Sequence, residues 1–184
     1  MRKGVLSLIF FASVLLLSSG CGTMYKVAVD ERSLSTQVED EEITMAIRKK
    51  FFDDATVKYL DISTYCYHGD VYLVGEYEDI KQREQAVNLA RGVQGVKSVS
   101  SYFLPKRSTD DCGKGENLKL MAKIKAKLIK DRDIWSTNIE VKTLQCRAVL
   151  LGLVGSEKEI RKAIAHARNV TGVKGVKSFL RPIE

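Results

Sequence analysis

"GVQGVKSV", residues 92–99, is the most informative stretch of the sequence, because the chain repeats it in slightly altered form as "NVTGVKGV" at residues 169–176. When Asp40–Arg107 is laid without a gap on Asn117–Glu184, 17 of 68 positions are identical. Apolar positions also stay in phase along the two segments, which chance matching does not produce. The sequence therefore contains two copies of one small domain.

Each copy shows the same order of hydrophobic patterns. Apolar residues recur every fourth position in 43–51 and again in 120–128, which predicts an amphipathic helix at the start of each copy. Two β-rich runs separated by a short turn follow, as in a hairpin. A second helix comes next, with Asp79 and Ser156 at matching N-cap positions. The predicted fold is α+β: two tandem αββαβ domains, each a small sheet with two helices packed on it.

The repeated phrase lies where the second helix of each copy must end. Gly92 and Asn169 are expected to take the left-handed conformation of a helix C-cap, which these two residue types tolerate best. Gly95 and Gly172 then complete a corner, and a strand follows. The phrase is a helix-to-strand corner that is repeated because the domain is repeated.

The first residues resemble a bacterial lipoprotein signal. A basic start precedes an apolar run of signal-peptide length, and "LLLSSGC" ends at Cys21 like a lipobox, although Ser18 stands where the commonest pattern has Leu. An ordinary cleaved signal that ends near a cysteine is the alternative. We expect a signal peptide at 1–20, an acylated Cys21, a tether at 21–38, domains at 39–105 and 117–184, and a linker at 106–116.

The motifs of both copies resemble the BON (bacterial OsmY and nodulation) domain. This family has a glycine in the second strand, an Ala-x-x-x-Ala helix and a final V-x-G-V-x-x-V. The matching residues are Gly75, Ala86, Ala90, Val93, Gly95, Val96 and Val99, then Gly152, Ala163, Ala167, Val170, Gly172, Val173 and Val176. The resemblance implies a non-enzymatic lipoprotein, anchored in the outer membrane and facing the periplasm, that binds phospholipid and supports outer-membrane integrity. It implies no cofactor.

The residues themselves show no catalytic or metal-binding signature. His68 falls in a predicted turn and His166 on a helix, and neither recurs in the other copy. "CYH" at 66–68 has no second Cys or His pair at a usable spacing, so we expect a turn histidine and no metal site. No phosphate loop, nucleophile elbow or dinucleotide motif occurs in the sequence.

Charge differs sharply between the two copies. Residues 39–105 hold eight Lys/Arg and twelve Asp/Glu, a net charge of −4, whereas residues 114–184 hold sixteen and seven, a net charge of +9. This asymmetry favours an anionic partner for the second copy. For an exported lipoprotein that partner is an anionic phospholipid or lipopolysaccharide surface and not nucleic acid. The alternative is a solubilising surface without a partner.

Three cysteines follow Cys21. Cys66 is in phase with buried positions and is expected to be a buried thiol that behaves as a small hydrophobic residue. Cys112 falls in the linker and Cys146 in a hairpin turn, where both are expected to be exposed. A Cys112–Cys146 disulfide would join the linker to the second copy in an oxidising compartment. Either thiol could instead pair between chains.

The most basic segment is the first helix of the second copy. We predict a membrane-binding site there, formed by Lys119, Lys123, Lys125, Lys127, Lys130 and Trp135. Lysines attract anionic lipid, and tryptophan settles at headgroup level. In the alternative, Trp135 fills the core and the lysines are simply solvated.

A second function class also stays open: a protein–protein adaptor in an envelope assembly or transport machine. The oligomeric state does not follow from the sequence.

Overall fold

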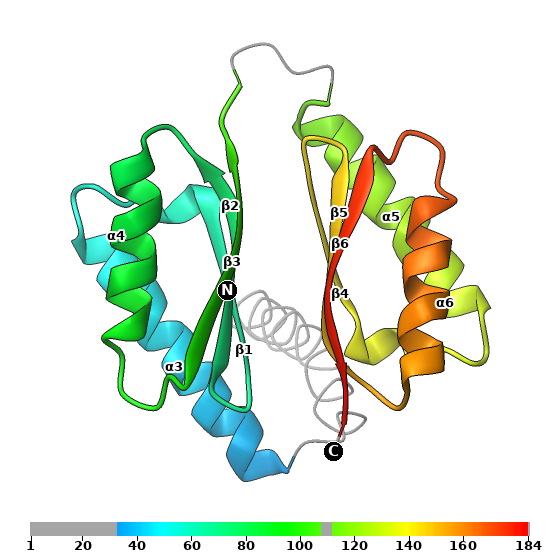
Figure 1. Cartoon of the computed structure of the whole chain (residues 1–184), viewed down its shortest axis with the longest axis horizontal. Helices are drawn as coiled ribbons and strands as arrows, with labels where there is room; N and C mark the ends of the chain where they lie inside the picture. Colours follow the sequence, from blue (N-terminus) through cyan, green and yellow to red (C-terminus); the bar gives the residue numbers. More distant parts are fainter. Residues whose placement is uncertain (1–32, 108–111, 184) are drawn as a thin grey trace, which may run out of the picture.

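The computed structural model describes residues 33–107 and 112–183, and each half has the predicted αββαβ order (Figure 1). The first domain consists of α3 (Leu34–Asp53), η1 (Tyr59–Asp61), β1 (Ile62–Tyr67), β2 (Asp70–Tyr77), α4 (Ile80–Arg91) and β3 (Ser98–Pro105). The second consists of α5 (Lys114–Lys130), η2 (Ser136–Asn138), β4 (Glu140–Leu144), β5 (Arg147–Val154), α6 (Glu157–Arg168) and β6 (Gly175–Pro182).

Two helices begin earlier than the sequence pattern suggested. Helix α3 starts at Leu34, capped by the Ser33 hydroxyl, so residues 34–38 of the expected tether 21–38 are helical. Helix α5 starts at Lys114, inside the expected linker 106–116. Residues 1–20 and Cys21, the expected signal and lipidation site, lie outside the described residues.

Each domain contains a three-stranded sheet whose central strand is the second one. In the order β1-β2-β3, β1 and β2 are antiparallel and β2 and β3 are parallel; the order β4-β5-β6 has the same pairing. Each hairpin turns over two residues with positive φ, His68 and Gly69 in the first domain and Gln145 and Cys146 in the second. These are the signs of type I′ geometry, which suits the twist of the flanking strands.

The first helix of each domain fixes the hairpin turn. The carboxylate of Asp40 in α3 accepts hydrogen bonds from the backbone amides of His68 (2.9 Å) and Gly69 (2.8 Å). At the equivalent place in α5, the side-chain oxygen of Asn117 accepts from the backbone amide of Cys146 at 3.1 Å. A polar residue, buried in the case of Asp40 and partly buried in the case of Asn117, therefore occupies the same position in both copies, because the turn amides need a partner.

The glycine of the second strand is required by close packing. A Cβ atom on Gly75 would lie 2.2 Å from the carbonyl oxygen of Asp61, and one on Gly152 would lie 1.9 Å from that of Asn138. Gly152 also has φ +139°, a backbone conformation that other residues rarely adopt. The central strand consequently passes directly against the segment that leads into the hairpin.

The helix-to-strand corner differs from the expected geometry. Gly92 and Asn169 have φ −82°, so the predicted left-handed C-caps are wrong. The helices end instead in a tight turn in which the next valine amide bonds the carbonyl three residues back. Positive φ occurs at Gly95 (+86°) and Gly172 (+99°). The reversal comes later because these glycines must pass close to Ile43 and Leu120 of the first helices.

The two sheets pack face to face, with the helices on the outer sides (Figure 1). Tyr72 and Val74 of the first sheet and Leu144, Val149 and Leu151 of the second form a buried cluster between the domains. The rings of Tyr72 and Phe179 lie 5.1 Å apart across it. Each sheet is thus covered on one face by its own helices and on the other by the second sheet, which explains the nearly continuous burial of β5.

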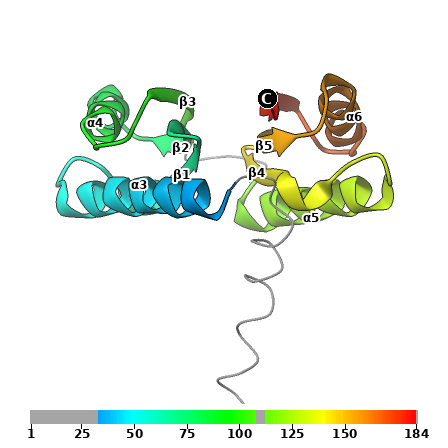
Figure 2. The same ribbon diagram turned by 90° about the horizontal axis from the view of Figure 1, so that it is seen from below.

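Polar contacts at the edges of this interface also join the domains. The side-chain amide of buried Gln145 donates to Glu76 (2.7 Å) and to the carbonyl of Pro105 (2.8 Å). Arg181 forms an ion pair with Asp70 at 2.8 Å. The first helices of the two domains, α3 and α5, lie in one layer of the molecule, and α4 and α6 lie in the other (Figure 2).

Candidate functional site

Helix α5 carries the five lysines of the predicted site. Its buried side consists of Leu120, Ile124 and Leu128, which are at most 1% exposed and belong to the core of the second domain. Because these residues recur every fourth position, the lysines fall on the remaining part of the helix surface. Gly113 stands at the N-cap and leaves the helix without a side-chain cap.

Two of the lysines are paired with carboxylates. Lys119 lies 3.6 Å from Glu116 within the helix, and Lys125 lies 3.4 Å from Glu140 of β4. Lys125 is on the β4 side of α5, away from the other lysines, so it does not join them in one patch. Exposed pairs of this kind are weak and leave most of the charge available to solvent.

The other three lysines line one side of α5. Lys127 donates to the carbonyl of Asn169 at 3.2 Å, whereas Lys123 and Lys130 have no acidic partner in the described part of the chain. A shallow groove of about 370 Å³ opens between this side of α5 and the end of α6. It is lined by Lys123, Ala126, Lys127, Lys130, Asn169, Val170 and Thr171.

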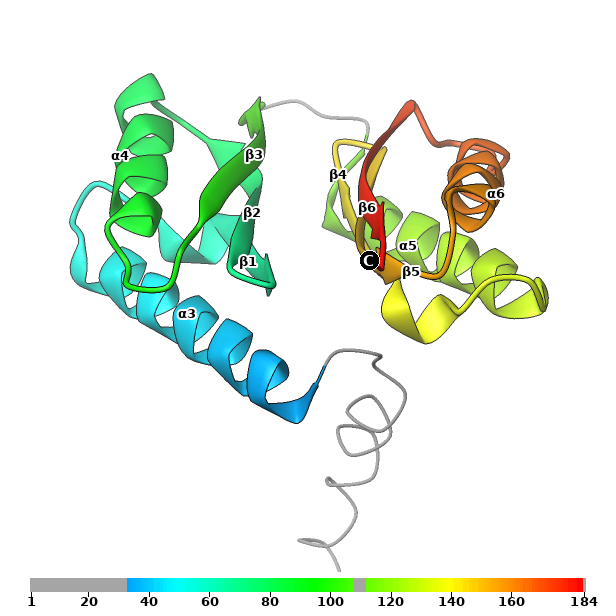
Figure 3. The same ribbon diagram turned by 60° about the horizontal axis from the view of Figure 1, so that its bottom comes forward.

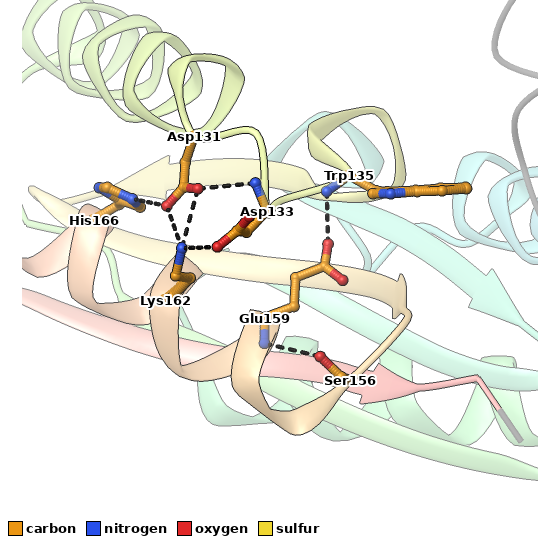
Figure 4. Close-up of polar contacts among 7 residues, drawn as sticks. All are labelled: Asp131, Asp133, Trp135, Ser156, Glu159, Lys162 and His166. Carbon is orange, nitrogen blue, oxygen red and sulfur yellow. Dashed lines mark hydrogen bonds and ion pairs between the residues drawn. The ribbon is translucent and has the colours of Figure 1, made fainter.

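The indole ring of Trp135 points into solvent. Its side chain is 54% exposed, while the neighbouring Ile134 is buried, so the alternative in which Trp135 fills the core is wrong. The backbone amide of Trp135 donates to the carboxylate of Glu159 in α6 at 2.7 Å (Figure 4). The same carboxylate accepts from the amide of Gly155 at 3.0 Å. Glu159 thereby fixes the backbone that presents the ring.

A charged cluster lies beside this segment, at the end of α5 (Figure 4). Asp131 contacts His166 (2.8 Å) and Lys162 (3.2 Å), and Lys162 also reaches Asp133 at 2.7 Å. The hydrogen bond to His166, together with those from the backbone of Asp133 and from Lys162, lowers the pKa of Asp131 to about 2. Asp131 therefore stays ionised and neutralises part of the positive charge around it.

An equivalent link between the first and second helices occurs in the first domain, where the partner of the carboxylate is an uncharged amide. Asp54 is the counterpart of Asp131 and accepts a hydrogen bond from the side-chain amide of Gln85 at 2.7 Å. It also accepts from the backbone amides of Thr56 and Val57. Because the carboxylate joins the end of the first helix to the second helix in both copies, its role is structural. His166 belongs to this tie, and His68 lies in the hairpin turn as predicted.

The cysteines are placed differently from expectation in one respect. The Sγ atoms of Cys112 and Cys146 are 2.04 Å apart, the distance of a disulfide, and join the linker to the second hairpin. Both residues are buried, at 2% and 5% exposure, so the expected exposure is wrong. They pack in the core of the second domain because the linker folds over the hairpin turn. Cys66 is buried as predicted and contacts Asp40.

Some exposed residues of this region were not part of the predicted site. Leu118 and Ile129 of α5 are 61% and 69% exposed, on the same side of the helix as Lys125. Their spacing of eleven residues places them along one line of the helix and could have revealed them.

Within residues 33–107 and 112–183, no helix has both the length and the apolar character needed to cross a membrane. The same residues contain no cluster of three or more potential metal ligands.

The structure is that of two small α+β domains joined sheet to sheet, and the second domain has an exposed basic helix followed in the chain by an exposed tryptophan. The family model of the BON domain matches residues 39–103 and 118–181. The chain therefore belongs to the BON domain family, and both copies are members. The helix-to-strand corner and the obligatory glycine of the second strand are the structural basis of the motifs that indicated this family.

Several curated proteins are similar over most of the chain. The osmotically-inducible protein Y of Escherichia coli is 32% identical and covers 85% of this chain and 79% of its own length. The outer membrane lipoprotein DolP of Haemophilus influenzae is 27% identical, covering 82% of this chain and 78% of its own. A 21 kDa hemolysin of Actinobacillus pleuropneumoniae is 31% identical, covering 80% and 76% respectively.

Proposed function

We propose that this protein is a non-enzymatic lipoprotein of the outer membrane that faces the periplasm, binds anionic phospholipid or lipopolysaccharide, and supports the integrity of that membrane. The observation that carries the proposal is that Trp135, which follows α5 in the chain, is exposed, as are Lys123, Lys127 and Lys130 of that helix. An expected lipid on Cys21 would hold this surface near a bilayer. The similarity to a protein named an outer membrane lipoprotein supports the location.

The chemistry of the surface suits an anionic bilayer. Each lysine near such a bilayer contributes on the order of 1 kcal/mol, and salt screens this contribution. An exposed indole ring is stable at headgroup level because its apolar ring and its N–H group both find suitable surroundings there. The first domain, with a net charge of −4, lacks this basic helix. In this proposal the second domain therefore makes the electrostatic contact with the bilayer.

The proposal is tested by sedimentation with vesicles. Residues 22–184, which contain every described element, should bind vesicles that contain phosphatidylglycerol, and binding should weaken as salt rises. The combined change Trp135→Ala, Lys123→Glu and Lys130→Glu should reduce the affinity roughly tenfold or more, given two reversed charges and a lost ring. Circular dichroism and the melting temperature should stay near wild type because all three side chains are exposed.

A matched control separates the site from net charge. Lys158→Glu and Arg161→Glu change the charge equally, but both residues are exposed on α6, in the other layer of the molecule. This variant should bind vesicles nearly as well as wild type. If both variants lose binding alike, the contact is not at α5. If the wild-type protein ignores anionic vesicles, the proposed function is wrong and the adaptor class becomes the better reading.

A further inference from the structure

Exposed large hydrophobic side chains are concentrated on one layer of the molecule. Among the described residues, nine of the ten that are strongly exposed lie on α3, on α5 or on the short turns that follow these helices, and only Ile80 lies on α4. Those on the first domain are Leu34, Val38, Met45, Phe52, Tyr59 and Leu60. The predicted site on α5 does not account for them.

The most apolar part of this surface is the end of α3 with the η1 turn. Phe52 is 68% exposed and Leu60 is 82% exposed. The ring of Phe52 lies 5.3 Å from that of Tyr59 in an edge-to-face arrangement. A groove of about 530 Å³ runs beside them and is also lined by Arg48 and Lys49. We call Phe52, Tyr59 and Leu60 the α3 patch.

We infer that the α3 patch inserts into the lipid bilayer as a second membrane contact, an inference that rests on the proposed function of α5. Both first helices lie in one layer, and each contacts the strands and the second helix of its own domain (Figures 2 and 3). Their exposed sides therefore form the outer surface of that layer. A bilayer that meets this layer can contact both helices together.

Charge around the α3 patch agrees with a lipid partner. Arg48 and Lys49 flank the apolar side chains and can reach anionic headgroups while those side chains enter the acyl region. Most acidic residues of α3 lie in its first half: Glu42 is ten residues from Phe52, a distance of about 15 Å along the helix. The exception is Asp53 beside Phe52, whose carboxylate is paired with Lys49 at 2.6 Å. The carboxylates of the first half need not approach the headgroups when the end of α3 is the part that inserts.

The short segment between Cys21 and α3 also favours a lipid bilayer as the partner of the α3 patch. Twelve residue steps separate Cys21 from Ser33, the cap of α3. Such a segment spans at most about 40 Å when fully extended. A lipid on Cys21 therefore keeps α3 within reach of the bilayer at all times. Basic α5 then supplies the salt-sensitive part of binding and the α3 patch supplies a salt-resistant part, because apolar burial is not screened.

The test places a tryptophan at each surface in turn. Trp135 is the only tryptophan of the chain, so the wild type reports on α5. Phe52→Trp in a Trp135→Phe background reports on the α3 patch, and Ile80→Trp in the same background is the matched control, because Ile80 is 55% exposed on α4. Vesicles of phosphatidylethanolamine and phosphatidylglycerol with brominated acyl chains quench a tryptophan that enters the bilayer.

The inference expects quenching and a blue shift at positions 52 and 135, and none at position 80. Quenching at 135 without quenching at 52 overturns this inference and leaves the proposed function standing. Absence of quenching at both overturns the proposed function as well. A blue shift at position 52 that appears without vesicles and grows with protein concentration means that a second copy covers the patch, and also overturns the inference.

A binding measurement adds an independent readout. Phe52→Ser with Leu60→Ser should leave binding at low salt nearly unchanged and reduce the binding that survives at high salt roughly tenfold, in line with the loss of two large apolar contacts. Melting temperature serves as the folding check, since both side chains are exposed. Equal loss at low and high salt, or no loss at either, contradicts the division of labour between the two helices.

Discussion

The guanidinium group of Arg181 in β6 lies 2.8 Å from the carboxylate of Asp70 in β2, so the last strand of the second domain is tied to the central strand of the first. Asp70 is also bonded by Ser98. Burial raises the pKa of Asp70, but the hydrogen bonds from Ser98 and Arg181 and the charges of Arg181 and Lys97 together lower it. The interface therefore holds Asp70 in its ionised form.

Arg181→Met should weaken the junction between the domains by about 1 kcal/mol at neutral pH. Because the pKa of Asp70 is lower in the folded state, its contribution is complete above the unfolded value and is lost as pH falls through the folded value. The variant and the wild type should thus converge in acid. Chemical denaturation across pH measures this. Lys174→Met, a change at an exposed lysine, is the control; a constant difference at all pH values contradicts the prediction.

Gly152→Ala should destabilise the second domain by at least ~1 kcal/mol, because the new Cβ would meet the Asn138 carbonyl at 1.9 Å in a positive-φ conformation. Gly115→Ala is the matched control: its Cβ would have nothing within 4 Å, and alanine favours the helix. Urea denaturation compares the two. Similar stabilities for both variants would show that the central strand can shift away from the η2 turn.

His166→Leu should raise the pKa of Asp131 from about 2 toward its ordinary 3.8, because the largest contribution to the lowered value is the hydrogen bond with His166. Leucine is chosen as the replacement because Leu89 occupies the equivalent position in the first domain. Carboxylate titration by NMR measures the change. The stabilisation by Asp131 is present above the unfolded value and disappears toward pH 2, so the variant should lose resistance to acid.

His68→Gln provides the comparison for that titration, because His68 lies in the first hairpin turn and does not contact Asp131. The Asp131 titration should be identical in this variant and in wild type. An Asp131 pKa that stays near 2 in His166→Leu would assign the shift to Lys162 and the Asp133 amide instead.

Reduction of the Cys112–Cys146 bridge should lower the free energy of unfolding by about 3 to 4 kcal/mol, the loop-entropy value for a sequence separation of 34 residues. Cys112→Ser should reproduce the loss, whereas Cys66→Ala should leave the bridge intact. Peptide mass mapping without reductant identifies the linked pair. Alkylation of both thiols before reduction, or a bridge between two chains, would contradict the intramolecular pairing.

Most of the fold could be predicted because the same hydrophobic pattern occurs in both copies of the domain. Helix positions such as Ala86 and Ala163, and strand positions such as Val71 and Ala148, are fully buried in both copies. Local rules also placed the N-caps correctly: Asp79 accepts from the amide of Lys81 and Ser156 from that of Glu159. These features depend on neighbours in sequence, which a periodic pattern reveals.

Features that depend on distant contacts were missed. The continuous apolar run of β5 is a sign of burial on both faces, but nothing local identified the first sheet as the cover for Val149 and Leu151. The positive φ at Gly95 follows from its contact with Ile43, which only the folded domain shows. For the site, the pattern identified the lysines and Trp135, but it could not reveal that Lys125 is paired with Glu140 or that Phe52 is exposed.

The sheet-to-sheet packing constrains how this gene can change. Because the inner face of each copy is the cover of the other, a substitution at Tyr72 must be compatible with Phe179, and neither copy can be deleted without exposing a broad apolar sheet face. The outer helices carry no such obligation toward each other. Duplication has therefore constrained the interior of the pair while leaving the exterior of each copy to change separately, as the different net charges of the two copies, −4 and +9, illustrate.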